Sequence, residues 1–122
     1  MIKKHKKRYP KNFDPKNPGK EDRDRLVLSN GHICPVYYAT LAHAGALRLS
    51  ELKTLRKFGS KLQGHPHREF LPIVETSSGP LGSGLSQAVG MALADRIDNG
   101  KGSSKQFYCL MGDGELDEGQ NW

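Results

Sequence analysis

At 122 residues the chain has room for one domain at most, and a hydrophobic fraction of 35% limits that domain to a small core. Its formal net charge of +6 does not mark a nucleic-acid-binding surface, because residues 1–25 hold ten Lys and Arg against four Asp and Glu, while residues 26–122 hold nine of each kind. The excess lies in a basic arm with few of the aromatic or groove-reading residues of nucleic-acid recognition. No apolar run approaches the roughly 18 residues of a membrane span.

The N-terminal part predicts an extended lead-in followed by a turn. Residues 1–22 lack apolar periodicity and contain three residues that disfavour regular structure, namely Pro10, Pro15 and Pro18. Residues 24–28 form a short apolar stretch, and Ser29-Asn30-Gly31-His32 after it is typical of a turn. We therefore expect no core element before this stretch.

Two helices are predicted in the middle of the chain. The first covers residues 35–45, because proline suits a first helical turn, apolar residues follow at helical spacing and a glycine ends the pattern. The second covers residues 50–59 and has one apolar face. That face consists of Leu52, Leu55 and Phe58. Residues 63–73 are rich in Gly, Pro and His and are predicted to form a loop.

The second half shows the alternation of helix and strand that is typical of α/β domains. A loop over 75–80 leads into a predicted helix over 85–97, which has an apolar stripe at helical spacing. The stripe consists of Leu85, Val89, Ala92, Leu93 and Ile97. Residues 106–111 are interpreted as a short, buried parallel strand that ends at a glycine-rich turn.

That turn, Gly112-Asp113-Gly114, lies where open α/β sheets bind ligands, just after a strand. Its glycines allow backbone N–H groups to approach a phosphate, and the Asp113 carboxylate requires a bridging cation if a phosphate binds beside it. Magnesium suits this bridge because it prefers carboxylate and phosphate oxygens. The alternative is an ordinary strand-ending turn with a solvated aspartate.

The glycine-rich string over 79–84 precedes the best predicted helix, whose N-terminus offers unpaired N–H groups and a partial positive charge to an anion. The string fits neither a P-loop nor a dinucleotide-binding fingerprint, and the alternative is a tight helix entry. His32 and His65 lie in glycine-flanked loops. There an imidazole can bind phosphate or sugar hydroxyls, move protons, or remain an ordinary surface residue.

The two cysteines, Cys34 and Cys109, do not form a C-x-x-C pair, which argues against zinc and redox motifs. Cys109 lies in the apolar run before the turn and is interpreted as a buried small hydrophobe. Such cysteines suit a reducing compartment, and the basic N-terminus is not followed by the apolar core of a secretory signal. We therefore expect a cytoplasmic protein without membrane contact.

Taken together, the motifs closely resemble the transketolase family, in particular the split transketolases whose amino-terminal half is a separate polypeptide. The residues that carry the resemblance occur in the family's order: Asp14-Pro15-Lys16-Asn17-Pro18, Asp22-Arg23-Asp24-Arg25, Leu28-Ser29-Asn30-Gly31-His32, Gly64-His65-Pro66, Glu75-Thr76-Ser77-Ser78-Gly79-Pro80-Leu81-Gly82 and Gly112-Asp113-Gly114-Glu115. The resemblance covers residues 13–122, which it implies are a partial N-terminal domain, and it leaves residues 1–12 as a basic lead-in. It also implies an incomplete thiamine-diphosphate-binding fold, an α/β structure with a parallel sheet flanked by helices.

The same resemblance implies a transferase that moves a two-carbon ketol unit between sugar phosphates with thiamine diphosphate and magnesium. Asp113 corresponds to a magnesium ligand, and the residues expected to border or line the cofactor are Gly79, Pro80, Leu81, Gly112 and Gly114. His32 and His65 are expected to face the diphosphate, the thiazolium or substrate hydroxyls, with His32 in both a catalytic and a cofactor-binding role. Glu118 corresponds to a carboxylate near the cofactor at a dimer interface.

Two departures from the family pattern lead us to expect a truncated fragment that is inactive alone. Residues 1–12 replace an apolar helical segment that carries another functional histidine, and the sequence stops at Trp122, before the remaining magnesium ligands and the pyrimidine-binding domain. The resemblance therefore implies a complementary C-terminal part or subunit as partner. It implies a homodimer or heterotetramer for the complete enzyme.

Three alternatives stay open. The chain can belong to a related thiamine-diphosphate enzyme such as a deoxyxylulose-phosphate synthase, although the Leu-Ser-Asn-Gly-His and Gly-His-Pro segments favour transketolase. It can instead be a non-catalytic remnant that acts at most as a binding or interaction module. Nucleic-acid binding by the basic arm rests on charge alone.

Overall fold

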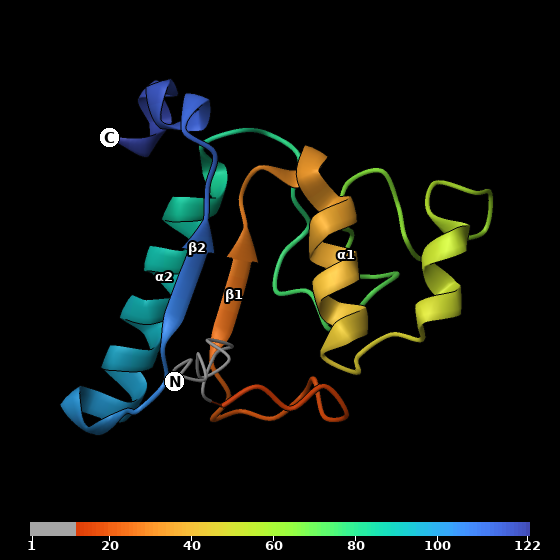
Figure 1. The fold of residues 1–122 in the computed structure, drawn as a ribbon. Coiled ribbons are helices and arrows are strands. Elements are labelled where there is room, and N and C mark those ends of the chain that lie inside the picture. The colour runs from red at the N-terminus through yellow and green to blue at the C-terminus, as the bar shows by residue number, and fades with distance from the viewer. Residues whose placement is uncertain (1–11) are drawn as a thin grey trace, which may run out of the picture.

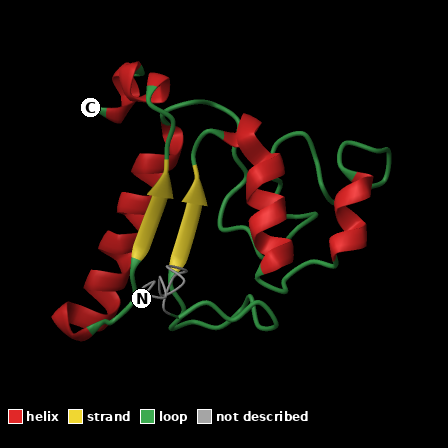
Figure 2. Cartoon of the chain, in the orientation of Figure 1, coloured by secondary structure: helices red, strands yellow, loops and turns green. Residues whose placement is uncertain are grey.

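Two parallel strands with helices on opposite sides make up the part of the chain that the structure describes, residues 12–122 of a computed structural model (Figures 1 and 2). The main elements are β1 (Arg25–Leu28), α1 (Cys34–His43), α2 (Ser83–Asn99) and β2 (Phe107–Leu110). Short 3-10 helices cover Gly31–Ile33, Leu49–Thr54, Gly100–Gly102, Gly114–Asp117 and Gly119–Asn121. The predicted α/β class with a parallel sheet flanked by helices is confirmed, whereas the predicted basic arm falls almost entirely outside the described residues.

The sheet joins two segments that lie far apart in the sequence. β1 and β2 pair in parallel, with Arg25 opposite Phe107 and Leu28 opposite Leu110. At the start of the pair, the backbone N–H of Gln106 donates to the Asp24 carboxylate at 3.0 Å, which helps to fix the register. β1 was not expected as a strand, because its short apolar stretch is flanked by charged residues. The structure shows that this stretch is a strand and that it pairs with β2.

β2 is less buried than its apolar sequence predicts. Tyr108 and Leu110 are 41% and 45% exposed, and Cys109 is half-buried. The parallel pairing of this segment is confirmed, but the prediction of a buried strand is wrong. Within the described residues β2 has a single strand neighbour, so one edge of it is unpaired.

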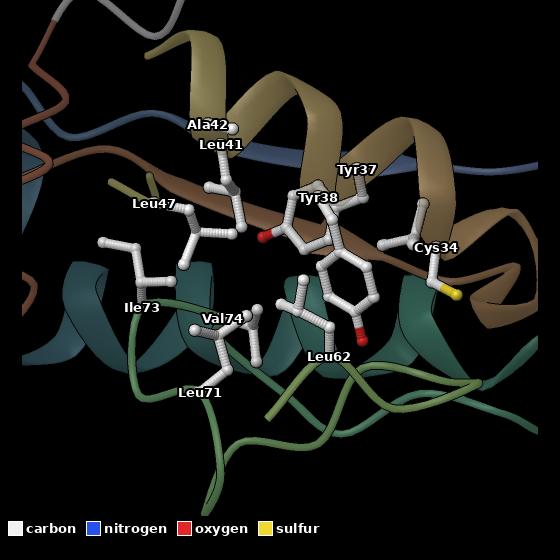
Figure 3. Close-up of a cluster of buried hydrophobic side chains, with 11 residues drawn as sticks. Cys34, Tyr37, Tyr38, Leu41, Ala42, Leu47, Leu62, Leu71, Ile73 and Val74 are labelled. Carbon is white, nitrogen blue, oxygen red and sulfur yellow. The ribbon is translucent and has the colours of Figure 1, made fainter. Parts of the chain in front are cut away.

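The hydrophobic core lies between α1 and the loop that follows the second predicted helix (Figure 3). Helix α1 begins one residue before Pro35, which suits a first helical turn, and buries Tyr37, Tyr38 and Leu41. The Tyr38 hydroxyl donates to the Gln63 carbonyl at 2.9 Å. Much of the opposite wall comes from the predicted loop, through Leu71 and Ile73, and from the residues that flank it, Leu62 and Val74.

The second predicted helix is shorter than its pattern suggests. It is a 3-10 helix over Leu49–Thr54, and Phe58 is fully exposed instead of sharing a face with Leu52 and Leu55. The backbone of Arg56 has a φ of 59°, a left-handed conformation that is rare outside glycine and reverses the chain before Phe58.

Helix α2 forms where it was predicted, but its apolar stripe does not face the core. Val89, Leu93 and Ile97 are 58%, 56% and 74% exposed. The helix packs on the strands through a narrower face, whose buried residues are Gly84, Ala88 and Asp95. No helix within residues 12–122 combines the length and apolarity that a membrane crossing requires.

A buried ion pair ties the start of β1 to the loop before α2. The guanidinium of Arg23 contacts the Glu75 carboxylate, and both side chains are almost fully buried. Arg25 contacts the other oxygen of Glu75 at 3.5 Å. Because an uncompensated buried charge is costly, this arrangement holds the loop in one position relative to the sheet.

Candidate functional site

The segments singled out in the sequence meet at the carboxyl ends of the two strands (Figure 1). The turn after β1 leads into α1, and the turn after β2 leads into the C-terminal 3-10 helices. Helix α2 runs in the opposite direction to the strands, so its first residues lie at the same end. This end of a parallel sheet is where α/β folds bind ligands.

Gly31 brings the two predicted histidine loops together. A Cβ atom on Gly31 would lie 3.0 Å from Cδ2 of His65 and 2.8 Å from Oγ of Ser78. Glycine is thus needed for the close approach of three segments. His32 follows directly, and both histidine side chains are exposed. The structure therefore places His32 and His65 in neighbouring loops at the same end of the sheet.

Gly82 connects the start of α2 to the C-terminal segment. Its φ is 81°, and a Cβ atom there would lie 2.9 Å from Cβ of Glu118 and 2.8 Å from Cγ of Gln120. The Gln120 side-chain amide donates to the carbonyl of Leu81. The segment that carries Glu118 therefore lies against the turn that contains Leu81 and Gly82. Gly79 and Pro80 precede this turn, and the Pro80 carbonyl accepts from the Ser83 hydroxyl at 2.9 Å.

The predicted metal ligand lies at the open rim of this end. Asp113 and Gly114 are exposed, and a Cβ atom on neighbouring Gly112 would lie 3.1 Å from Nδ2 of Asn30. Within residues 12–122, no group of three or more His, Cys, Asp or Glu side chains is close enough to hold a metal ion. Asp113 is therefore a single candidate ligand, and its magnesium role stays a prediction.

Glu115 is the central side chain of this end, and no role was predicted for it. One carboxylate oxygen accepts from the Ser29 hydroxyl and from the Gly82 N–H at 2.8 Å. The other accepts from the Gly112 N–H at 3.0 Å. Ser29 in turn accepts from the Gly84 N–H at 3.0 Å. A buried carboxylate thus joins the ends of both strands to the start of α2.

These contacts determine the charge state of Glu115. Burial disfavours ionisation, but hydrogen bonds from Ser29, Gly82 and Gly112, together with the nearby His32, outweigh it and hold the pKa of the Glu115 carboxyl below its usual value of 4.5. The ionised side chain accepts from the N–H groups of Gly82 and Gly112, which were predicted from the sequence to face an external anion. The predicted anion site at the start of α2 therefore has fewer free N–H donors than expected, because those of Gly82 and Gly84 already donate within the protein.

Two other polar groups at this end are buried beside the glycine contacts. Oδ1 of buried Asn30 and Oγ of Ser78 have no hydrogen-bond partner among residues 12–122. Buried polar atoms are normally paired. Oδ1 of Asn30 is an acceptor, so its partner would be a donor such as a water or a sugar hydroxyl and not a diphosphate. Asn30 lies within the Ser-Asn-Gly-His turn, which was the only signal in the sequence that could have pointed to it.

Comparison with known proteins identifies the family. Residues 5–122 match the family described as transketolase, thiamine diphosphate binding domain. Human transketolase is 45% identical over 118 residues, which cover 97% of this chain and 18% of the human protein. A 6-deoxy-6-sulfo-D-fructose transketolase subunit from Clostridium sp. is 45% identical over 110 residues, covering 90% of this chain and 39% of that subunit.

Solved structures agree with this result. Transketolase from Leishmania mexicana superimposes with a TM-score of 0.80 at 41% identity, over 88% of this chain and 17% of its own. Transketolase from Pichia stipitis in complex with sedoheptulose 7-phosphate gives 0.81 at 39% identity, over 90% of this chain and 18% of its own. The chain belongs to the transketolase family, within its thiamine-diphosphate-binding domain. It spans about a fifth of the length of these full transketolases.

Proposed function

We propose that this chain supplies part of the cofactor site of a transketolase-type transferase, which moves a two-carbon ketol unit between sugar phosphates. The observation that carries the proposal is the convergence of His32, His65, Gly82 and Gly112 at the carboxyl ends of two parallel strands. Family membership supports thiamine diphosphate as the cofactor. The unpaired oxygens of Asn30 and Ser78 are compatible with a polar group at this end.

Each predicted residue has a task in this proposal. Asp113 would hold magnesium, which offsets the negative charge of a diphosphate beside an acidic segment. Gly79, Pro80, Leu81, Gly112 and Gly114 would surround the cofactor with small or apolar surfaces. Thiamine diphosphate, when bound, supplies the group that stabilises carbanion character on the two-carbon unit.

The three remaining residues act on the substrate or near the cofactor. His32 and His65 are exposed, so each can hydrogen-bond a sugar hydroxyl or hold a proton at a ring nitrogen. Glu118 lies against the Gly82 turn, where its carboxylate can contact a neighbouring subunit near the cofactor.

The proposal includes a complementary C-terminal part or subunit, and a homodimer or heterotetramer as the complete enzyme. The relatives are much longer than this chain, and two of its surfaces lack neighbours within residues 12–122. These surfaces are the outer edge of β2 and the exposed stripe of Val89, Leu93 and Ile97 on α2. We expect the complementary part to cover both.

Calorimetric titration of thiamine diphosphate in the presence of Mg²⁺ tests the proposal. The titration compares the 122-residue chain with a fusion enzyme, in which this chain replaces the matching segment of human transketolase. We expect negligible binding to the chain alone and saturable, Mg²⁺-dependent binding to the fusion enzyme. Tight binding to the chain alone would refute the need for a complementary part, and no binding to a folded fusion enzyme would refute the cofactor role.

A further inference from the structure

The Glu115 carboxylate links three segments that are remote in sequence. Its partners are the hydroxyl of Ser29, which lies 86 residues away, and the backbone N–H groups of Gly82 and Gly112. The carboxylate is buried, with 3% of the residue exposed. None of these donors can turn to water without breaking a buried hydrogen bond, so the three segments are held to one another at this point.

The surroundings leave little freedom for a different arrangement. A Cβ atom on Gly84 would overlap the Ser29 side chain, so α2 begins in direct contact with the end of β1. The Asn121 side-chain amide donates to the Glu115 backbone carbonyl, which closes the C-terminal segment over the carboxylate. Asp113, two residues earlier, is exposed at the rim of the same turn.

We propose that Glu115 is a positioning residue of the site, which fixes the Gly112-Asp113-Gly114 turn and the Gly82 turn relative to the end of β1. It acts through Gly112 and Gly82 and does not itself contact cofactor or substrate. By accepting from these amides, it also keeps them from binding the diphosphate directly. Contact with the diphosphate is then left to a cation at Asp113 and to residues such as His32 and Gly114, so this inference rests on the proposed function.

The substitution Glu115→Gln separates hydrogen bonding from shape. Glutamine has nearly the same volume, but one of its two terminal groups is a donor. Because Gly82 and Gly112 donate to different oxygens of Glu115, the NH₂ group must face one N–H donor. Asp117→Asn is the matched control, since Asp117 lies in the same 3-10 helix with an exposed side chain.

Two readouts on the cofactor-free and cofactor-titrated fusion enzyme test the inference. Hydrogen exchange of the Gly82 or Gly112 amide should become about 10-fold faster or more in Glu115→Gln, because a buried hydrogen bond is lost. The Kd for thiamine diphosphate with Mg²⁺ should rise by a similar factor, and saturating cofactor should recover most of the lost rate. Asp117→Asn should change neither quantity.

Unchanged exchange in Glu115→Gln would overturn the inference whatever happens to cofactor affinity. Faster exchange with an unchanged Kd would overturn the link between Glu115 and the site. If Glu115→Gln does not fold, Ser29→Ala is measured in its place. In Ser29→Ala only the Gly84 amide should exchange faster, while the Gly112 amide stays protected by Glu115. Faster exchange of the Gly112 amide would contradict the inference. Failure of the wild-type fusion enzyme to bind cofactor would overturn the proposed function, and the exchange rates would still decide whether Glu115 fixes both turns.

Discussion

The Ser29 hydroxyl donates to the Glu115 carboxylate across 86 residues of sequence and joins the end of β1 to the turn that follows β2. Ser29 also accepts from the Gly84 N–H, so one small side chain connects both strands to the start of α2. The carboxyl end of the sheet and the start of α2 therefore form a single hydrogen-bonded unit.

The exposed stripe on α2 should make the isolated chain associate with itself. Replacing Leu93 and Ile97 by lysine removes two large apolar side chains that are 56% and 74% exposed. We expect size-exclusion chromatography with light scattering to shift from aggregates to monomers. A control with Gln87→Lys and Asp98→Asn adds the same charge at exposed polar positions, and equal improvement in the control would show that charge alone is responsible.

Gly84 and Gly90 should respond oppositely to alanine, although both lie in α2. A Cβ atom on Gly84 would overlap Ser29, whereas one on Gly90 would meet no atom of residues 12–122 within 4 Å. Gly84→Ala should lower the free energy of unfolding by about 1–3 kcal/mol through overpacking. Gly90→Ala should raise it by about 0.5–1 kcal/mol, because alanine is the better helix former. Urea unfolding of the lysine-substituted chain measures both changes, and equal effects would contradict the contact.

The buried ion pair should matter far more than an exposed one. Glu75→Ala leaves Arg23, which is 3% exposed, without its partner and should cost about 3–5 kcal/mol of unfolding free energy. Asp22→Ala breaks a contact to Lys20 in which the Asp22 side chain is 66% exposed, and should leave the unfolding free energy nearly unchanged. Comparable losses in thermal unfolding would show that Arg23 and Glu75 do not form the structural link assigned to them.

Glu51 should give the 3-10 helix over Leu49–Thr54 a pH-dependent contribution. Hydrogen bonds from Lys61 and from the Arg48 backbone outweigh burial and lower the pKa of Glu51 from 4.5 to about 2. A lowered folded-state pKa contributes stability above 4.5 that is lost as the pH falls toward 2. Glu51→Gln should therefore be less stable than wild type near about pH 7, with the difference shrinking toward about pH 3. A difference that is constant with pH, or one that exposed Glu69→Gln reproduces, would argue against this origin.

Local sequence patterns predicted where helices and strands form better than they predicted what those elements pack against. The helices that became α1 and α2 and the strand that became β2 were all recognisable from spacing and punctuation. β1 was missed because only four residues form it and Asp24 and Arg25 interrupt its apolar character. The exposure of the stripe on α2 could not be predicted, since a pattern shows which side of a helix is apolar but not what covers it.

The site was predicted as separate loops, and the structure adds the group that joins them. His32, His65 and Asp113 could be singled out because glycines flank them. Glu115 could not, because two of its three partners lie 86 and 33 residues away and one carboxylate after a turn is indistinguishable from a solvated one. Long-range hydrogen bonds of this kind leave no period or spacing in a sequence.

The most direct test of the central claim is a calorimetric titration of thiamine diphosphate with Mg²⁺ into the fusion enzyme carrying Asp113→Asn. If Asp113 holds the cation that bridges to the diphosphate, its loss should weaken binding by about 100-fold and abolish most of the Mg²⁺ dependence, while Asp117→Asn binds as wild type. Wild-type affinity and unchanged Mg²⁺ dependence in Asp113→Asn would contradict the assignment of this end of the sheet as the cofactor site.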